Sequence, residues 1–144
     1  MARIKLKIPA YTLFSTRLPV RINDINYGNH LGNNQLVGLL HEARVQWLTH
    51  HGFSELNAGG VALIMAELTV TFKQQAYYPD VLQVQISSNP IDIGRSSFDL
   101  YYEVTKNSAG NNILVAVAKT IMVCYDYQKK KTVQIPPKLK EIIS

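Results

Sequence analysis

The densest group of residues able to do chemistry lies between Asp24 and Arg44, in the stretch DINYGNHLGNNQLVGLLHEAR. Asparagines, histidines, glycines and charged residues stand there directly before an apolar periodicity. A helix start can stabilise a developing negative charge, because its first N–H groups have no partner within the helix. The backbone amides of Gly32, Asn33 and Asn34 are therefore candidate donors to an oxyanion, and Gly32 would let a substrate approach the backbone closely. A well-capped helix without any catalytic role would need the same residues.

Three side chains of this stretch could act together with such amides. Asn26 could hold a water or a carbonyl by hydrogen bonds, although an amide cannot accept a proton as a general base. The imidazole of His30 can both accept and donate a proton, so it could serve as a base or orient a substrate. It could equally bond a backbone carbonyl and shape the loop. Asp24 suits a structural role in the turn better than a catalytic one.

Two charged residues on the following helical segment are further candidates. Glu42 falls off the apolar stripe, and Arg44 lies at its margin. If they point into a pocket, Arg44 could stabilise an oxyanion and Glu42 could orient a water. The alternative is a surface ion pair, which contributes little to stability.

The apolar residues after this polar stretch predict a long helix. They recur at spacings of three and four, as Leu36, Leu40, Ala43 and Trp47. Asn33 or Asn34 is placed to cap this helix, and Gly52 is placed to end it. We expect the leucines and the tryptophan in the core and not in a ligand site.

Strand-like segments surround this helix in the sequence. Residues 10–22 are rich in β-branched and aromatic types, and Pro19 indicates an edge strand or a bulge. Four more segments follow: VALIMAELTVTFK, DVLQVQISS, SSFDLYYEV and NILVAVAKTIMVCY. The last is the most uniformly apolar, as expected of an interior strand, and NSAGNN before it predicts a hairpin loop. The final PPKLKEIIS predicts a short helix or a tail.

This order predicts one α+β domain over residues 1–144, with one long helix against a curved antiparallel sheet of about five strands. A single helix cannot cover both faces of such a sheet. Some apolar sheet surface, or an exposed edge, should therefore be buried by a second subunit. We expect a homodimer or a homotetramer.

Composition excludes several other classes of protein. The net charge is +5, and no apolar run approaches the roughly 18 residues of a membrane span. No zinc-type spacing, P-loop, dinucleotide fingerprint or nucleic-acid motif is present, so we expect no metal, no nucleic acid and no membrane as partners. The N-terminal MARIKLKIPA does not fit a secretory signal, and the one cysteine, Cys124, suits a reducing cytoplasm.

The stretch from Asp24 to Arg44 resembles the hotdog-fold thioesterases of the 4-hydroxybenzoyl-CoA thioesterase type. Their pattern runs roughly D-x-D-x-x-G-H-x-N-N, followed by a helix ending in E-A-R. It aligns without a gap on Asp24, Asn26, Asn29, His30, Asn33 and Glu42-Ala43-Arg44. The later segments FKQQAYYPDVLQV, GRSSF and KTVQIPPKL also resemble the family, so the likeness spans nearly the whole chain.

The resemblance implies a hotdog fold and an acyl-CoA thioesterase, in which water attacks the thioester near Asn26 and releases an acid and a thiol. The implied substrate brings its own CoA, so no further cofactor is expected, and an acyl-carrier protein is an alternative carrier. Arg95, Ser96 and Lys131 align with family positions that meet the phosphates of CoA, which suits a guanidinium and an ammonium. The alternative for the run Lys129–Lys131 is a solvated turn.

The sequence departs from the family pattern at two positions. Asn26 stands where the usual catalytic carboxylate would be, and Asn29 stands where a glycine precedes the histidine. A subset that resembles polyketide-releasing enzymes carries Asn at the first position with an Arg on the helix, and the spacing from Asn26 to Arg44 suits this subset. The alternative of a different class is a non-catalytic acyl-CoA-binding hotdog protein that lost its carboxylate. A hotdog dehydratase fits less well, since its histidine-centred signature is missing.

Overall fold

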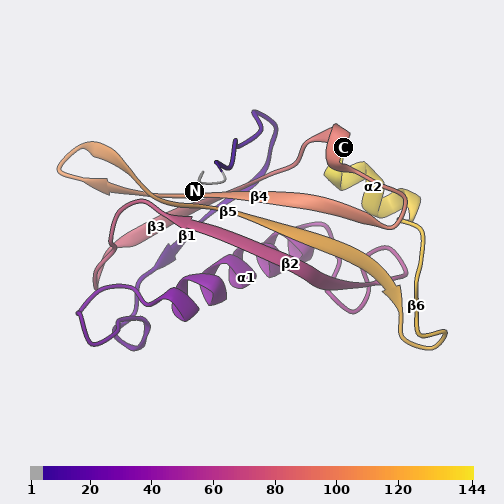
Figure 1. The fold of residues 1–144 in the computed structure, drawn as a ribbon, viewed down its shortest axis with the longest axis horizontal. Coiled ribbons are helices and arrows are strands. Elements are labelled where there is room, and N and C mark those ends of the chain that lie inside the picture. The colour runs from indigo at the N-terminus through magenta and orange to yellow at the C-terminus, as the bar shows by residue number, and fades with distance from the viewer. Residues whose placement is uncertain (1–4) are drawn as a thin grey trace.

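A long helix, α1 (Asn33–His50), packs against a curved antiparallel sheet in the computed structural model, which describes residues 5–144 (Figure 1). The strands are β1 (Thr12–Pro19), β2 (Ala62–Phe72), β3 (Val81–Ser87), β4 (Ser97–Ser108), β5 (Asn111–Asp126) and the short β6 (Lys131–Thr132). The short helices are η1 (Ile22–Asp24), η2 (Pro90–Asp92) and α2 (Pro137–Ile143). The predicted α+β class is confirmed.

The sheet has the order β1-β3-β4-β5-β2, with β6 added beside the end of β5. Every pairing is antiparallel. The five expected strands are therefore present, and the uniformly apolar β5 is an interior strand, as predicted. Pro19 ends the edge strand β1, where its missing N–H removes no interior hydrogen bond. The second edge of the sheet is β2.

The predicted apolar stripe of α1 faces the sheet and is buried. Its four members are at most 1% exposed: Leu36, Leu40, Ala43 and Trp47. Gly52 ends the helix, as predicted, with a φ of 76°, and its N–H donates to the Thr49 carbonyl oxygen at 2.9 Å. The N-terminal cap was predicted wrongly, because Gly32 occupies that position and Asn33 is already helical.

The two faces of the sheet differ in character. On β4, Phe98, Leu100 and Val104 point toward α1 and are fully buried. The opposite face places charged and hydroxyl groups between its apolar residues; for example, Tyr101 donates to Asp92 at 2.6 Å. The feature left for a second subunit is therefore the open edge of β2, rather than a purely apolar face.

The two ends of the molecule carry different candidate residues. The loop before α1 and the β4–β5 hairpin lie at one end of the sheet, and α2 and β6 lie at the other (Figure 1). Cys124 lies near this second end and is buried, and burial raises the pKa of its thiol to about 11. It is the core thiol expected from its strand context.

Candidate active site

Asp24 stabilises the loop between β1 and α1 through hydrogen bonds to Arg21. This side chain is 4% exposed, and its carboxylate accepts from the Arg21 backbone N–H at 2.8 Å and from the Arg21 guanidinium at 3.2 Å. Burial alone would raise the pKa of Asp24, but the hydrogen bonds and charge of Arg21 outweigh burial and lower it. The structural role predicted for Asp24 is therefore supported by its contacts.

Asn26 shapes the turn that follows. Its Oδ1 accepts the N–H of Gly28 at 2.9 Å, and its backbone carbonyl accepts the N–H of Asn29 at 3.0 Å. Asn29 has a φ of 61°, a left-handed conformation that glycine adopts freely and asparagine tolerates better than most residues. The replacement of the family's glycine by Asn29 is thus compatible with the same backbone turn.

His30 lies between this turn and the helix start and is half-buried. Its Nδ1 is 3.3 Å from the Leu31 carbonyl oxygen and 3.5 Å from Asn26 Nδ2. Its Nε2 lies over Gly28, where an added Cβ would be only 2.9 Å away. The contact with Leu31 matches the loop-shaping alternative, and the absence of a side chain at Gly28 leaves Nε2 uncovered on that side.

The start of α1 offers free backbone donors, although not the full set predicted. The N–H of Gly32 donates to the Asp24 carbonyl oxygen at 3.0 Å, so its prediction as an oxyanion donor was wrong. Within residues 5–144, no acceptor is recorded for the N–H groups of Asn33, Asn34 and Gln35, the first three of the helix. The donors predicted at Asn33 and Asn34 remain available, and the sequence analysis missed Gln35.

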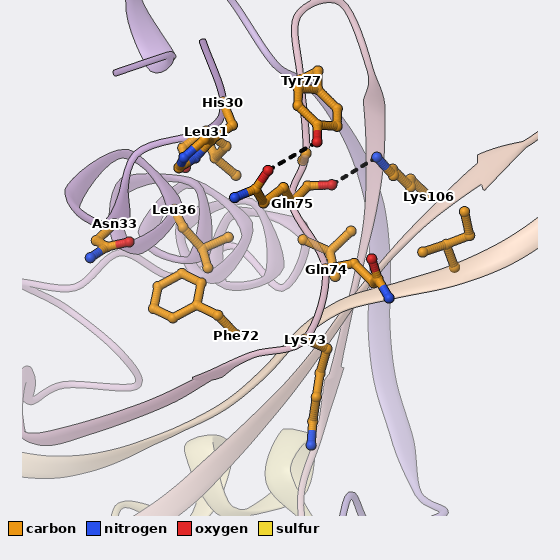
Figure 2. A pocket seen from close by; sticks show the side chains of 13 residues that line it. His30, Leu31, Asn33, Leu36, Phe72, Lys73, Gln74, Gln75, Tyr77 and Lys106 are labelled. Atoms are coloured by element: carbon orange, nitrogen blue, oxygen red, sulfur yellow. Dashed lines mark hydrogen bonds between the residues drawn. The ribbon is translucent and has the colours of Figure 1, made fainter. Parts of the chain in front are cut away.

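A cavity of about 520 Å³ opens beside this helix start. Its walls come from the helix start and the loop before it, from residues 72–77 at the end of β2 and after it, and from β4 and β5. In Figure 2 the ring of Phe72 lies beside Leu36, and Lys73 points away from the cavity. Lys106 closes the far wall, since its Nζ donates to the Gln75 carbonyl oxygen at 2.9 Å (Figure 2).

This second wall of the cavity was not predicted from the sequence. Phe72 was predicted only as part of a strand and Gln75 only as part of a segment with family likeness, and Lys106 is more than thirty residues further along the chain. Lys106 also donates to Asp80 Oδ2 at 3.0 Å and lies 5.0 Å from the centre of the Tyr77 ring. The one available signal was the polar run Lys73–Gln75 directly after an alternating strand.

Glu42 and Arg44 do not join this cavity. Glu42 is exposed on a different face of α1, where its carboxylate accepts from Gln46 Nε2 at 3.1 Å. Arg44 is buried further along the helix and donates from Nε to Glu55 at 3.3 Å and from Nη1 to the Tyr102 hydroxyl at 3.1 Å. Within one chain, the predicted catalytic set therefore separates into Asn26 and His30 at the helix start and two residues elsewhere.

The predicted CoA-binding residues lie at the opposite end of the sheet. The carbonyl of Arg95 accepts the N–H of Ile135 at 2.8 Å, and the carbonyl of Ser96 accepts the N–H of Cys124 at 2.8 Å. Lys131 is exposed on β6. The three residues are thus near one another, but distant from the helix start of the same chain (Figure 1).

Two further properties concern partners and metals. Among the helices of residues 5–144, none is long and apolar enough to cross a bilayer. The same residues contain no group of three or more histidine, cysteine, aspartate or glutamate side chains arranged to hold a metal ion.

Known proteins resemble this chain in both sequence and fold. Residues 20–143 match the thioesterase-like superfamily. An acyl-CoA thioester hydrolase, YbgC of Escherichia coli, is 30% identical over 129 residues, which cover 87% of this chain and 91% of the relative. The predicted thioester hydrolase is thereby confirmed at the level of the family.

Solved structures confirm the hotdog fold. A 1,4-dihydroxy-2-naphthoyl-CoA thioesterase from Synechocystis superposes with a TM-score of 0.79 at 24% identity, over 90% of this chain and 94% of that one. A variant of 4-hydroxybenzoyl-CoA thioesterase, in complex with 4-hydroxybenzoyl-CoA, gives a TM-score of 0.80 at 19% identity, over 91% and 98%. With its fold and most of its sequence matched, the chain belongs to the thioesterase-like superfamily.

Proposed function

We propose that this protein hydrolyses acyl-CoA thioesters, with the thioester carbonyl bound at the start of α1. The family and the curated relatives named as acyl-CoA thioester hydrolases support this reaction. The observation that carries the proposal is the set of three N–H groups, on Asn33, Asn34 and Gln35, that have no acceptor in the described chain. They stand beside a cavity that His30 also lines.

The reaction follows from these donors. A water attacks the carbonyl carbon, and the electron pair of the C=O bond moves to oxygen, which becomes an oxyanion. The free N–H groups and the positive end of the helix dipole stabilise this charge more than they stabilise the neutral carbonyl. The intermediate then collapses, the C–S bond breaks, and the CoA thiolate takes up a proton, which leaves a free acid and CoA.

His30 is the base in this proposal. The tautomer that carries hydrogen on Nδ1 can donate it to the Leu31 carbonyl oxygen, 3.3 Å away, and then Nε2 is free to take a proton from water. Asn26 holds the turn through Gly28 and lies 3.5 Å from the same ring. An amide therefore replaces the family's carboxylate as a positioning group, while the proton goes to His30.

A second copy of the chain completes the site in this proposal. Two β2 edges that pair in antiparallel fashion would place the Ala62 end of one strand beside the Phe72 end of the other. Within each chain the Ala62 end lies next to Tyr125, whose other neighbour is Thr132 of β6. Lys131 of one subunit would thus come near the cavity of the other, where the CoA phosphates would lie. Met65, which is 44% exposed on β2, supports the same interface.

The carrier of the acyl group and the compartment are the finer parts of the proposal. CoA is the carrier that the relatives' names support, and an acyl-carrier protein is the alternative, which the net charge of +5 would suit because such carriers are acidic. The buried, unpaired Cys124 supports a reducing cytoplasm as the compartment.

A non-catalytic acyl-CoA-binding protein is the second candidate, and Asn26 in place of a carboxylate favours it. The test is thiol release from a broad panel of acyl-CoA esters by the purified protein. Hydrolysis of at least one ester would support the enzyme, and tight binding of acyl-CoA without turnover of any ester would support the binder. Light scattering at micromolar concentration tests the assembly, and a monomer mass would contradict the intersubunit site.

A further inference from the structure

A second cavity, of about 350 Å³, lies midway along α1 between this helix and the edge strand β2. Much of its wall is aliphatic, with Val37 and Leu40 from the helix and Leu68 from the strand. Its polar side chains are His41, Arg44, Glu55 and Thr120, and the His41 ring is hydrogen-bonded to Glu55 through Nε2. It is thus a mostly apolar cavity with one charged corner, formed by Arg44 and Glu55, and this is the usual composition of a binding site for a small organic group.

The charged corner is built from buried side chains. Arg44 is 5% exposed, and its Nε and Nη1 donate to Glu55 and to the Tyr102 hydroxyl. That hydroxyl is 2.8 Å from Thr120 Oγ1. The remaining amino group, Nη2, has no hydrogen-bond partner in the part of the chain that the structure describes. Nη2 is not among the fully buried, unpaired side-chain nitrogens of the described residues, so it is open to the cavity, where water or a bound group can accept from it.

Arg44 keeps its positive charge in this position. Burial lowers the pKa of its guanidinium, but the hydroxyl of Tyr102 and the carboxylate of Glu55 raise it further than burial lowers it. The spare N–H groups are therefore donors at any pH at which the protein is folded. The Glu55 carboxylate is shared by Arg44 and the His41 ring, and it would repel a second carboxylate, so a neutral acceptor suits Nη2 of Arg44 better.

The two cavities lie at successive positions along the same two elements, α1 and β2. Leu36 and Phe72 line the cavity at the helix start, and Val37 and Leu68 line the second one. From Asn33 to Arg44 the helix rises by about 16 Å. An acyl chain whose thioester lies at the helix start and that extends along α1 past Val37 would therefore end near Arg44.

We propose that the second cavity receives the far end of the acyl group, and that Arg44 selects chains that carry a neutral hydrogen-bond acceptor, a hydroxyl or keto oxygen, at that end. This inference rests on the proposed function, because it takes the helix start as the place of the thioester. In it, Nη2 of Arg44 donates to the distal oxygen, and the aliphatic wall holds the methylene groups. Arg44 is a specificity residue here, not a donor to the reacting carbonyl.

The test uses CoA thioethers, which contain no ester to hydrolyse, so that binding is measured apart from catalysis. Alkyl-CoA thioethers of increasing length, each with and without a terminal hydroxyl group, are titrated by calorimetry. At the length that reaches Arg44, the hydroxyl form should bind about 10- to 100-fold more tightly than the plain form, the value of a hydrogen bond to a charged group. The preference should vanish or reverse in Arg44→Met.

The matched control is Val37→Ala, which removes aliphatic wall and should weaken both thioethers without changing their ratio. Tighter binding of the plain thioether at every length by the wild-type protein would overturn the inference, as would an unchanged ratio in Arg44→Met. The wild-type comparison decides the question even if Arg44→Met does not fold. Failure of the proposed function would be seen separately, as no thiol release from any ester.

Discussion

The start and the middle of α1 differ in how far their hydrogen-bond donors are already paired. At the start, the N–H of Asn33 has no acceptor among the described residues, and Nδ1 of His30 is bonded to the carbonyl oxygen of Leu31. In the middle, Arg44 is buried, its Nε and Nη1 are paired with Glu55 and Tyr102, and only Nη2 is spare within residues 5–144. A charge that forms and disappears during a reaction is best stabilised by several neighbouring donors that are fixed yet unpaired in the resting protein, so we place the chemistry at the start, where three successive N–H groups are free in the described chain.

The comparison also explains why Arg44 was assigned a catalytic role from its sequence. An arginine 18 positions after Asn26 matches the spacing of a thioesterase subset. Spacing alone does not show that Tyr102, on a distant strand, holds this guanidinium. The distinction between the two regions can therefore be tested by removing one group at a time, beginning with the largest expected effect.

Replacement of Asn33 by proline should have the largest effect on the reaction. Proline lacks the N–H but is well tolerated at the first helical position, and Gly32 before it has an extended backbone, with ψ of 157°, as a residue before proline requires. We expect kcat to fall about 100- to 1,000-fold, as for the loss of one oxyanion donor. The melting temperature should change little, which circular dichroism would check.

Asn33→Ala is the control, since it removes the side chain and keeps the N–H. A kcat for Asn33→Ala close to that of the wild type, beside a strong loss in Asn33→Pro, would assign the effect to the backbone donor. Equal losses in both variants would instead assign it to the Asn33 side chain.

Asn26→Ala should have the next largest effect. It removes the acceptor that holds the N–H of Gly28, so the turn over which the His30 ring lies would no longer be fixed. We expect kcat to fall about 10- to 100-fold, less than for a direct oxyanion donor, because Asn26 acts through His30. Steady-state assays of thiol release give the kcat of this variant. A loss seen only in KM would show that Asn26 contacts the substrate instead.

The sequence predicted the elements of this fold well, because they depend on local periodicity. The helix stripe through Leu36 and Trp47, the edge position of the strand that carries Pro19 and the five strands all follow from spacing and residue type, although the first strand is shorter than the predicted residues 10–22. The cap at Gly32 did not, since asparagines next to it were the better caps by residue preference. Tertiary contact decided this position, because the Gly32 N–H is held by the carbonyl of Asp24.

Only those residues of the site that lie close together in the sequence were predicted. The loop residues Asn26 and His30 could be identified because they lie close together in the sequence. Lys106 and Tyr77 could not, because they reach the cavity from other strands and loops. Which N–H groups are free could not be read from the sequence either, because it depends on where the chain folds back.

Asp24→Asn should have a moderate effect, on stability rather than on chemistry. The amide would lose the charged hydrogen bonds to Arg21, so we expect a loss of about 1–2 kcal/mol in the free energy of unfolding, with the attraction partly screened because Arg21 is exposed. The folded pKa of Asp24 is lowered, so its contribution is present at neutral pH and is lost as the pH falls below about 4. Urea unfolding of both proteins at neutral and acid pH would show this; a difference that grows toward acid pH would contradict it.

The smallest effect is expected far from both regions, at the other end of the sheet. Arg95→Ala or Lys131→Ala should raise KM for acyl-CoA about 3- to 10-fold and leave kcat nearly unchanged, because phosphate contacts are the same in the ground and transition states. Lys129→Ala is the matched control, a neighbouring lysine in the turn before β6. An unchanged KM in both variants would mean that the phosphates bind elsewhere.

Mixing two inactive or weakened subunits would show which chain supplies the phosphate contacts. In a mixed dimer of Asn33→Pro and Lys131→Ala subunits, the two defects meet in one site if Lys131 acts across the interface. The other site then combines an intact helix start with an intact Lys131 from the other chain, so it should work with the KM of the wild type. If Lys131 acts within its own subunit, every site in the mixed dimer carries one defect, and no activity with the wild-type KM appears. Steady-state kinetics on refolded mixtures therefore decides whether the helix start and the distant basic end belong to one site.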